Sequence, residues 1–275
     1  MVELRESIQW SEQAGVKVYL PQTAINGSDK KEFASNERFE MTVRSKNPER
    51  ALFDDILAKS DFIQTFQDVA DLIDVHEGQT VLELGASHGW ASVMMKVDCP
   101  GAYVIVSDLV PECVRYASYY ERALASTVDE KWAFSVRDIP FTDAQFDRIF
   151  AFAAFHHFGD HGDYSHTLGE IARVLKPGGK IVLLYEPSSP GFLYEMARRR
   201  VNRKREHECV DEDVLLVSRL RQIAAPLGLS LQAAPFPIFQ HRGSVGSTVY
   251  YYLLNKLNLG RLTVCTNNIV MQKAN

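Results

Sequence analysis

The spacing of apolar residues changes near residue 80, and this change divides the chain into three parts. Between residues 80 and 187, short apolar runs alternate with stretches whose apolar residues recur every three to four positions. The runs predict strands and the stretches between them predict helices. Strands are expected over 80–84, 103–107, 132–136, 147–153 and 180–185. Such alternation over short connections indicates right-handed parallel crossovers, with helices on both faces of one doubly wound α/β sheet.

The segments that flank this alternation follow other patterns. Residues 49–74 carry apolar residues at helical spacing and predict two helices, and residues 16–20 predict a short strand that ends at Pro21. After residue 187 we expect helices over 190–206 and 211–227, strands over 229–234 and 262–272, and an irregular aromatic stretch between these strands. This predicts an N-terminal helical and irregular cap over 1–75, a core over 76–187, and a C-terminal part over 188–275 that completes the sheet.

Composition and charge narrow the classes of protein. The chain has 275 residues and is 46% hydrophobic, which suits a globular protein with a sizeable core. A net charge of −5 argues against a partner bound through nucleic-acid phosphates. The four cysteines are scattered without metal-ligand spacing, so neither a disulfide framework nor a metal site is expected. The charged N-terminus and the absence of a long apolar run predict a cytoplasmic protein without a membrane span.

A glycine-containing turn follows the first predicted strand, in the run VLELGASHGW at residues 81–90. In an open α/β sheet, ligands bind beyond the carboxyl ends of the strands where the strand order reverses. A dinucleotide fingerprint needs G-x-G-x-x-G, and this loop lacks the second glycine. Ser87 stands where a glycine is expected, and a positive φ there would cost about 1–2 kcal/mol. Asp108, at the end of the second strand, suits a ribose diol in either type of nucleotide cofactor.

Four segments in register carry a resemblance to a known family. VLELGASHGW is followed by VIVSDLVPECVRYA at 104–117, VRDIPFTDAQFDRIFAFAAFHHF at 136–158 and EIARVLKPGGKIVLLYEP at 170–187. Together they resemble the class I S-adenosylmethionine-dependent methyltransferases, in the small-molecule branch with the ubiquinone/menaquinone-type and natural-product enzymes. The resemblance implies S-adenosylmethionine as the cofactor. It also implies a Rossmann-like sheet, mostly parallel with an antiparallel last strand, with N-terminal helices and a helical insertion after strand five.

The same resemblance assigns cofactor-binding roles. It places Asp108 on the two ribose hydroxyls and Asp138 on the adenine amino group. A carboxylate suits a vicinal diol because it has two acceptor oxygens. Further positions are expected at the methionine end, at the adenine or at the start of the helix: Glu83, Gly85, Ala86, Ser87, Gly89, Leu109 and Ile139.

Methyl transfer to a hydroxyl benefits from a general base, and His156 and His157 follow the fourth strand. Either histidine is a candidate base, and a structural or substrate-orienting role is the alternative. Glu186, at the end of the fifth strand, is a further candidate at the acceptor. Residues 198–206 read RRRVNRKRE. One interpretation is a solvated helix face, and the other is that Arg199, Arg200 and Arg203 bind an anionic acceptor such as a carrier-linked or nucleotide-linked metabolite.

The expected function is therefore methyl transfer to a small-molecule acceptor, with oxygen favoured over nitrogen as the methylated atom. Two other classes of protein stay open at this point. A Rossmann-type NAD(P) oxidoreductase or epimerase would use Asp108 for a nicotinamide dinucleotide but leaves residues 136–158 unexplained. A non-catalytic protein that keeps the methyltransferase fold would bind the cofactor without turnover. No nucleic-acid partner is expected.

Overall fold

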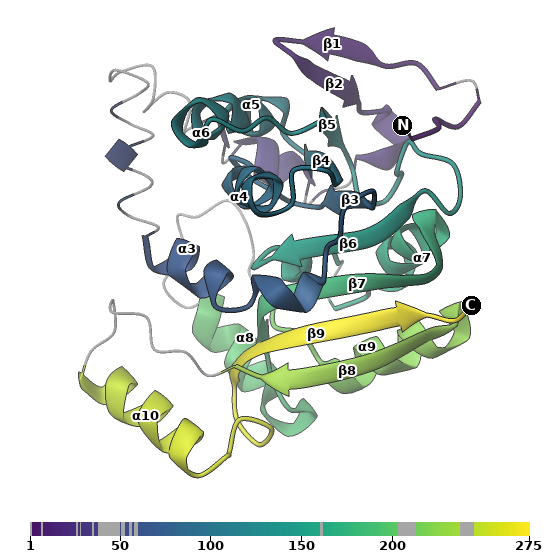
Figure 1. Cartoon of the computed structure of the whole chain (residues 1–275). Coiled ribbons are helices and arrows are strands. Elements are labelled where there is room, and N and C mark those ends of the chain that lie inside the picture. The colour runs from purple at the N-terminus through teal and green to yellow at the C-terminus, as the bar shows by residue number, and fades with distance from the viewer. Residues whose placement is uncertain are drawn as a thin grey trace.

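A nine-stranded sheet with helices on both faces forms the body of the protein (Figure 1). The computed structural model describes residues 2–6, 8–25, 27, 29–34, 36–37, 50, 53–54, 57, 60–159, 162–202, 213–236 and 245–275. The strand order is β1-β2-β5-β4-β3-β6-β7-β9-β8. The strands are β1 (Ser11–Gln13), β2 (Val16–Tyr19), β3 (Thr80–Glu83), β4 (Tyr103–Asp108), β5 (Glu130–Phe134), β6 (Phe146–Phe152), β7 (Leu175–Ser188), β8 (Leu229–Pro235) and β9 (Cys265–Lys273).

The central strands are parallel, and the order reverses at β3. β3 pairs in parallel with β4 on one side and with β6 on the other, while β9 is antiparallel to both β7 and β8. This confirms the predicted doubly wound, mostly parallel sheet with an antiparallel last strand. The reversal at β3 creates the switch point beyond which such sheets bind ligands.

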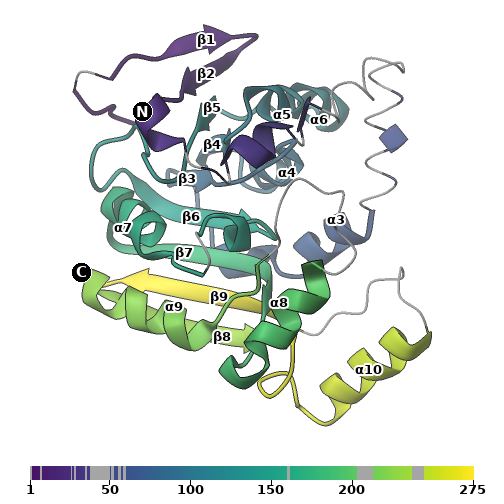
Figure 2. The same cartoon turned by 180° about the vertical axis from the view of Figure 1, so that it is seen from behind.

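Two helical layers cover the sheet. α7 (Ser165–Val174) and α9 (Val217–Ala224) lie on one face, which Figure 2 shows from the front. The helices of the other face are α3 (Ser60–Gln67), α4 (Trp90–Asp98), α5 (Pro111–Arg115) and α6 (Ala117–Leu124), with the short turn η2 (Ala70–Ile73). Beyond β7 the chain forms η4 (Gly191–Leu193), α8 (Tyr194–Asn202) and, before β9, α10 (Val245–Lys256).

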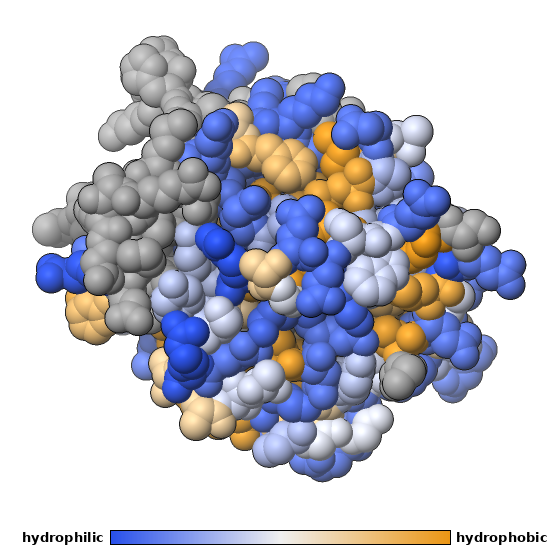
Figure 3. All heavy atoms as spheres, turned by 90° about the horizontal axis from the view of Figure 1, so that it is seen from above, coloured by the Kyte–Doolittle hydropathy of each residue, from blue (hydrophilic) through white to orange (hydrophobic). Residues whose placement is uncertain are grey.

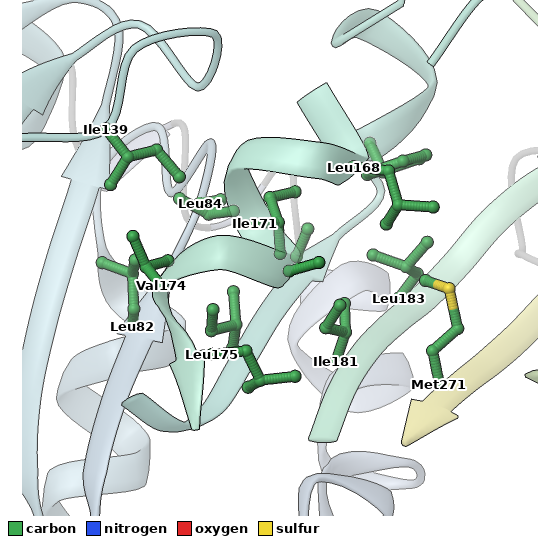
Figure 4. Packing of buried hydrophobic residues seen from close by; sticks show 14 of the residues in the cluster. Leu82, Leu84, Ile139, Leu168, Ile171, Val174, Leu175, Ile181, Leu183 and Met271 are labelled. Atoms are coloured by element: carbon green, nitrogen blue, oxygen red, sulfur yellow. The ribbon is translucent and has the colours of Figure 1, made fainter. Parts of the chain in front are cut away.

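The core forms because successive residues of each strand point to opposite faces. Leu82 packs with Ile171 and Leu183 under α7, whereas its neighbour Val81 packs with Val93 of α4 on the other face. Figure 4 shows the first of these clusters, in which α7 lays Leu168, Ile171 and Val174 onto the sheet. The near-continuous apolar runs of the sequence thus correspond to strands that are buried on both faces.

Three features differ from the sequence expectation. The N-terminal part adds a hairpin to the sheet, with β2 parallel to β5 and β1 at the edge. The third strand of the predicted core, β5, begins and ends two residues earlier than expected. The aromatic stretch expected to be irregular contains the helix α10. The sequence did not predict this helix because its apolar residues lie on almost all sides and give no amphipathic period.

The surface above the hairpin edge is mainly hydrophilic, with apolar side chains in separate small areas (Figure 3). Within the described ranges, no helix combines the length and the apolar character needed to cross a bilayer.

Candidate functional site

A cavity of about 380 Å³ opens at the switch point of the sheet. Its walls come from the residues that follow four parallel strands: Gly85 after β3, Leu109 after β4, Ser135 after β5 and Ala154 after β6. The volume lies in the range of small-molecule sites, about 300–1,000 Å³. The cavity therefore occupies the position where an open α/β sheet binds its ligand.

Asp108 presents a carboxylate to this cavity from the end of β4. One oxygen accepts a hydrogen bond from the backbone N–H of Ser87 at 2.7 Å, and the other accepts one from the N–H of Val110 at 3.1 Å. Burial raises the pKa of Asp108, and these two N–H groups oppose that shift. Because a carboxylate offers about four lone-pair sites, each oxygen keeps capacity for a ligand hydroxyl.

The turn between β3 and α4 uses left-handed backbone conformations. Gly85 has φ +67°, and a Cβ there would come within 2.9 Å of both Ala154 Cβ and the ring of Phe158. Ser87 has φ +49°, although it is not a glycine. This conformation aims the Ser87 N–H at Asp108 and costs about 1–2 kcal/mol. The serine at the glycine-like position therefore keeps the strained backbone that the position demands.

Gly89, Ala86 and Glu83, predicted at the cofactor, are not brought to the cavity wall. Gly89 caps α4 with φ +70°, and a Cβ there would lie 2.8 Å from Ala117 Cβ, so this glycine allows two helices to approach. Ala86 is buried and donates its N–H to the Ser107 carbonyl at 2.9 Å. Gly89 and Ala86 therefore contribute to the shape of the turn.

Glu83 points under α4, where its carboxylate accepts hydrogen bonds from the N–H and the hydroxyl of Ser92. Only 3% of the residue is exposed, and burial raises its pKa to about 8. The expectation that Glu83 faces the methionine part of a ligand is thus not supported, since its oxygens are held inside the fold.

Asp138 and Ile139, predicted at the adenine, are not in the cavity wall. The Asp138 carboxylate accepts hydrogen bonds from Arg5 and from the Tyr19 hydroxyl (2.9 Å) in the N-terminal segment. The Ile139 N–H donates to Glu170 at 3.1 Å. Because β5 ends at Phe134, its carboxyl edge is formed by residues 135–137, and these line the cavity instead.

The two candidate bases have different surroundings. His157 lines the cavity, whereas His156 is buried behind it with Nδ1 2.8 Å from a Glu186 carboxylate oxygen. Their rings lie 4.1 Å apart between centroids. His157 is therefore the one of the pair that a ligand in the cavity can reach.

Glu186 does not face the cavity, contrary to the expectation that it touches the acceptor. It is fully buried at 0% exposure, and its oxygens accept the backbone N–H groups of Ala154, Phe155 and His156 at 3.0, 2.8 and 3.2 Å. This set of bonds fixes the short turn η3 (Phe155–His157) from the end of β7. Glu186 thus positions the turn that carries the histidines.

The arginines predicted at the acceptor are not in the cavity wall. Arg199 and Arg200 lie exposed on α8, and Arg203 falls outside the described residues. The basic run therefore belongs to the outer surface as far as the structure describes it.

Sequence reasoning missed several cavity residues. Asp29, Glu32 and Asn36, from a helical N-terminal segment, cover one side of the cavity, and His88 of the turn lines it with its ring 5.3 Å from that of Tyr116. No motif marks these positions, because the N-terminal segment is brought to the site only by the tertiary fold. Among the described residues, no cluster of three or more His, Cys, Asp or Glu side chains suits a metal ion.

Comparison with known proteins agrees with this geometry. Residues 82–183 match the family model described as a methyltransferase domain. The demethylmenaquinone methyltransferase of Thermus thermophilus is 33% identical over 125 residues, 44% of this chain and 55% of that protein. The 27-O-demethylrifamycin SV methyltransferase of Amycolatopsis mediterranei is 28% identical over 138 residues, 48% of each chain. This chain spans about half the length of these curated relatives.

Solved structures show the same fold. The YcgJ protein of Bacillus subtilis superposes with a TM-score of 0.56 at 20% identity, over 77% of this chain and 99% of that one. A sarcosine dimethylglycine methyltransferase, described as putative, from Galdieria sulphuraria gives a TM-score of 0.57 at 17% identity, over 88% and 97%. Residues 82–183 are thus similar to a methyltransferase domain, and the whole sheet has the fold of these solved structures. The likeness is to the branch that includes small-molecule enzymes.

Proposed function

We propose that this protein transfers a methyl group from S-adenosylmethionine to a small-molecule acceptor, at a hydroxyl group. The observation that carries the proposal is the Asp108 carboxylate at the switch-point cavity, fixed by the N–H groups of Ser87 and Val110 with lone pairs left over. The curated relatives are named as methyltransferases of demethylmenaquinone and of 27-O-demethylrifamycin SV, which supports a small-molecule acceptor, and the second name specifies an oxygen.

The residues at the cavity fit the proposed cofactor. Asp108 would accept hydrogen bonds from both ribose hydroxyls, and Leu109 would pack against the adenine. Ser135 and Arg137, rather than Asp138, would lie at the edge of the adenine. Gly85 and Ser87 would border the methionine end.

The sulfonium supplies an activated methyl group for an in-line displacement, so the protein has to align the acceptor and exclude water. Asp29, Glu32 and Asn36 contribute to that exclusion by lining the cavity. His157 would accept the proton of an acceptor hydroxyl, since histidine titrates near neutral pH and this ring is at the cavity wall. Glu186 acts through the turn it holds, as a positioning residue.

An NAD(P) oxidoreductase is the weaker alternative. A dinucleotide loop directs its N–H groups at a pyrophosphate, whereas the Ser87 N–H donates to Asp108. A non-catalytic binding role would need the cavity but no histidine in its wall.

Calorimetric titration tests the proposal. We expect S-adenosylhomocysteine to bind and NAD⁺ not to bind. Asp108→Asn should weaken the binding at least ten-fold, because it replaces a charge-assisted acceptor. Asp138→Asn is the matched control, since Asp138 bonds to Arg5 and Tyr19 outside the cavity. Tight binding of NAD⁺, or an equal loss in both variants, would refute the proposal.

A further inference from the structure

Exposed apolar side chains gather on two helices near the carboxyl edge of the sheet. Among the described residues, fourteen large apolar side chains are exposed, and eight of them come from η4–α8 and from α10 with the loop after it. They are Phe192, Met196, Val249, Tyr250, Tyr252, Leu253, Leu257 and Leu262. Phe192 is 77% exposed and Leu262 60%, so these are not the margins of buried residues. Large exposed apolar areas mark interaction sites.

The exposed face of α10 is a continuous arc. At 3.6 residues per turn, Tyr252, Val249, Leu253 and Leu257 fall within about 140° of one another, and Lys256 lies inside the same arc. The helix is anchored beside this arc, because Leu254 is only 3% exposed and the Tyr250 hydroxyl, at the edge of the arc, donates to the Val264 carbonyl at 3.0 Å. The helix is thus held to the body by one side and presents an apolar face outward.

The two helices are neighbours. Figures 1 and 2 both show α8 and α10 at the same end of the molecule, and the charge of Arg200 acts on the Tyr251 phenol. On α8, Met196 and Arg200 are spaced four residues apart and share a face, and Phe192 precedes them in η4. The exposed residues of both helices therefore lie at the same end of the molecule, and we refer to residues 192–200 and 249–262 together as the apolar–basic surface.

The charge on this surface opposes that of the whole chain. Residues 191–202 and 245–262 carry five cationic side chains (Arg198, Arg199, Arg200, Lys256 and Arg261) and one acid, Glu195, whereas the chain as a whole has a net charge of −5. A second copy docked through a two-fold axis would place this patch against itself and oppose its cations. Apolar side chains flanked by Lys and Arg, with tyrosines among them, instead match the interface of an anionic bilayer.

We propose that the apolar–basic surface docks the protein peripherally on an anionic lipid bilayer. Residues such as Tyr252, Leu253 and Phe192 enter the headgroup region, and Arg199, Arg200 and Lys256 contact lipid phosphates. In Figure 1, α10 lies at the end of the sheet toward which β6 points, the edge that carries the cavity. Docking there brings a bilayer-dissolved acceptor to the same side of the molecule as the cavity. The docking goes beyond the proposed methyl transfer and stands without it.

The test is co-sedimentation of the full chain with vesicles. We expect binding to phosphatidylcholine vesicles that contain phosphatidylglycerol, weakened by high salt, and little binding to phosphatidylcholine alone. The double variant Tyr252→Ser/Leu253→Ser and the charge reversal Arg199→Glu/Lys256→Glu should each lower the partition coefficient at least ten-fold. Val97→Ser/Leu124→Ser is the matched control, because these residues are 45% and 41% exposed on α4 and α6.

Binding of S-adenosylhomocysteine by every variant, measured in parallel, shows that each is folded and separates this proposal from the proposed function. Absence of vesicle binding by the wild type overturns the docking proposal while leaving the cofactor site standing. Equal vesicle binding by all variants would also overturn the docking proposal. The same holds for a wild-type dimer that the Tyr252→Ser/Leu253→Ser change dissociates into monomers.

Discussion

Replacing Ser87 by glycine should stabilise the protein. Ser87 has φ +49°, and a side chain in this left-handed region costs about 1–2 kcal/mol that glycine does not incur. Glycine keeps the backbone N–H that donates to Asp108 at 2.7 Å, so the link between the turn and β4 is retained. The serine hydroxyl is not required for that link.

The magnitude follows from two opposing contributions. Relief of the left-handed strain favours the variant by about 1–2 kcal/mol. The extra conformational freedom of glycine in the unfolded chain disfavours it by about 0.4–1 kcal/mol. The net gain is about 1 kcal/mol, which corresponds to a rise in Tm of about 2–4 °C for a chain of this size.

Thermal and urea unfolding of Ser87→Gly, Ser87→Ala and the wild type measure the effect. Ser87→Ala keeps a Cβ at the same φ, so its stability should not rise. Ala125→Gly is a benchmark away from the cavity, because Ala125 caps α6 with φ +50° and should show a similar gain. A Ser87→Gly variant that is less stable than the wild type, beside a stabilised Ala125→Gly, would refute the reasoning about strain.

Three further changes probe the buried groups around the site. Gly85→Ala should lower the free energy of unfolding by about 2–5 kcal/mol, because the new Cβ would combine a positive φ with contacts of 2.9 Å to Ala154 and Phe158. A urea midpoint at the wild-type value would contradict this. The pKa of Glu83 is raised to about 8, so the folded state binds more protons than the unfolded state above pH 4.5, and stability falls as pH rises toward 8. Glu83→Gln should flatten that fall when unfolding is measured from pH 5 to 8, and an unchanged slope would exclude Glu83 as its source. Glu186→Gln keeps an oxygen that accepts backbone N–H groups but alters the hydrogen bond to the His156 ring. The pH profile of kcat should therefore shift while the affinity for S-adenosylhomocysteine is retained. An unchanged profile would leave Glu186 a purely structural role.

The sequence predicted the parts of the site that depend on strand order. Apolar runs and short connections defined the parallel strands, and Asp108 follows from its place at the end of β4. Asp138, which the resemblance assigns to the adenine, lies outside the cavity wall. The strand β5 ends two residues earlier than expected, so residues 135–137 lie at the carboxyl edge.

Burial and tertiary contact account for the other differences. Glu83 and Glu186 have the residue type expected of ligand contacts, but their oxygens satisfy N–H and O–H groups inside the fold, which no spacing in the sequence reveals. The helix α10 escaped prediction because its apolar residues surround it, a pattern that the docking surface explains better than a core does.

The most direct test of the account is a crystal structure of the protein with S-adenosylhomocysteine. The account predicts both ribose hydroxyls within hydrogen-bond distance of the Asp108 carboxylate and the adenine beside Ser135 and Arg137, with Asp138 still bonded to Arg5 and Tyr19. A nucleoside bound elsewhere, or one whose ribose does not touch Asp108, would contradict it.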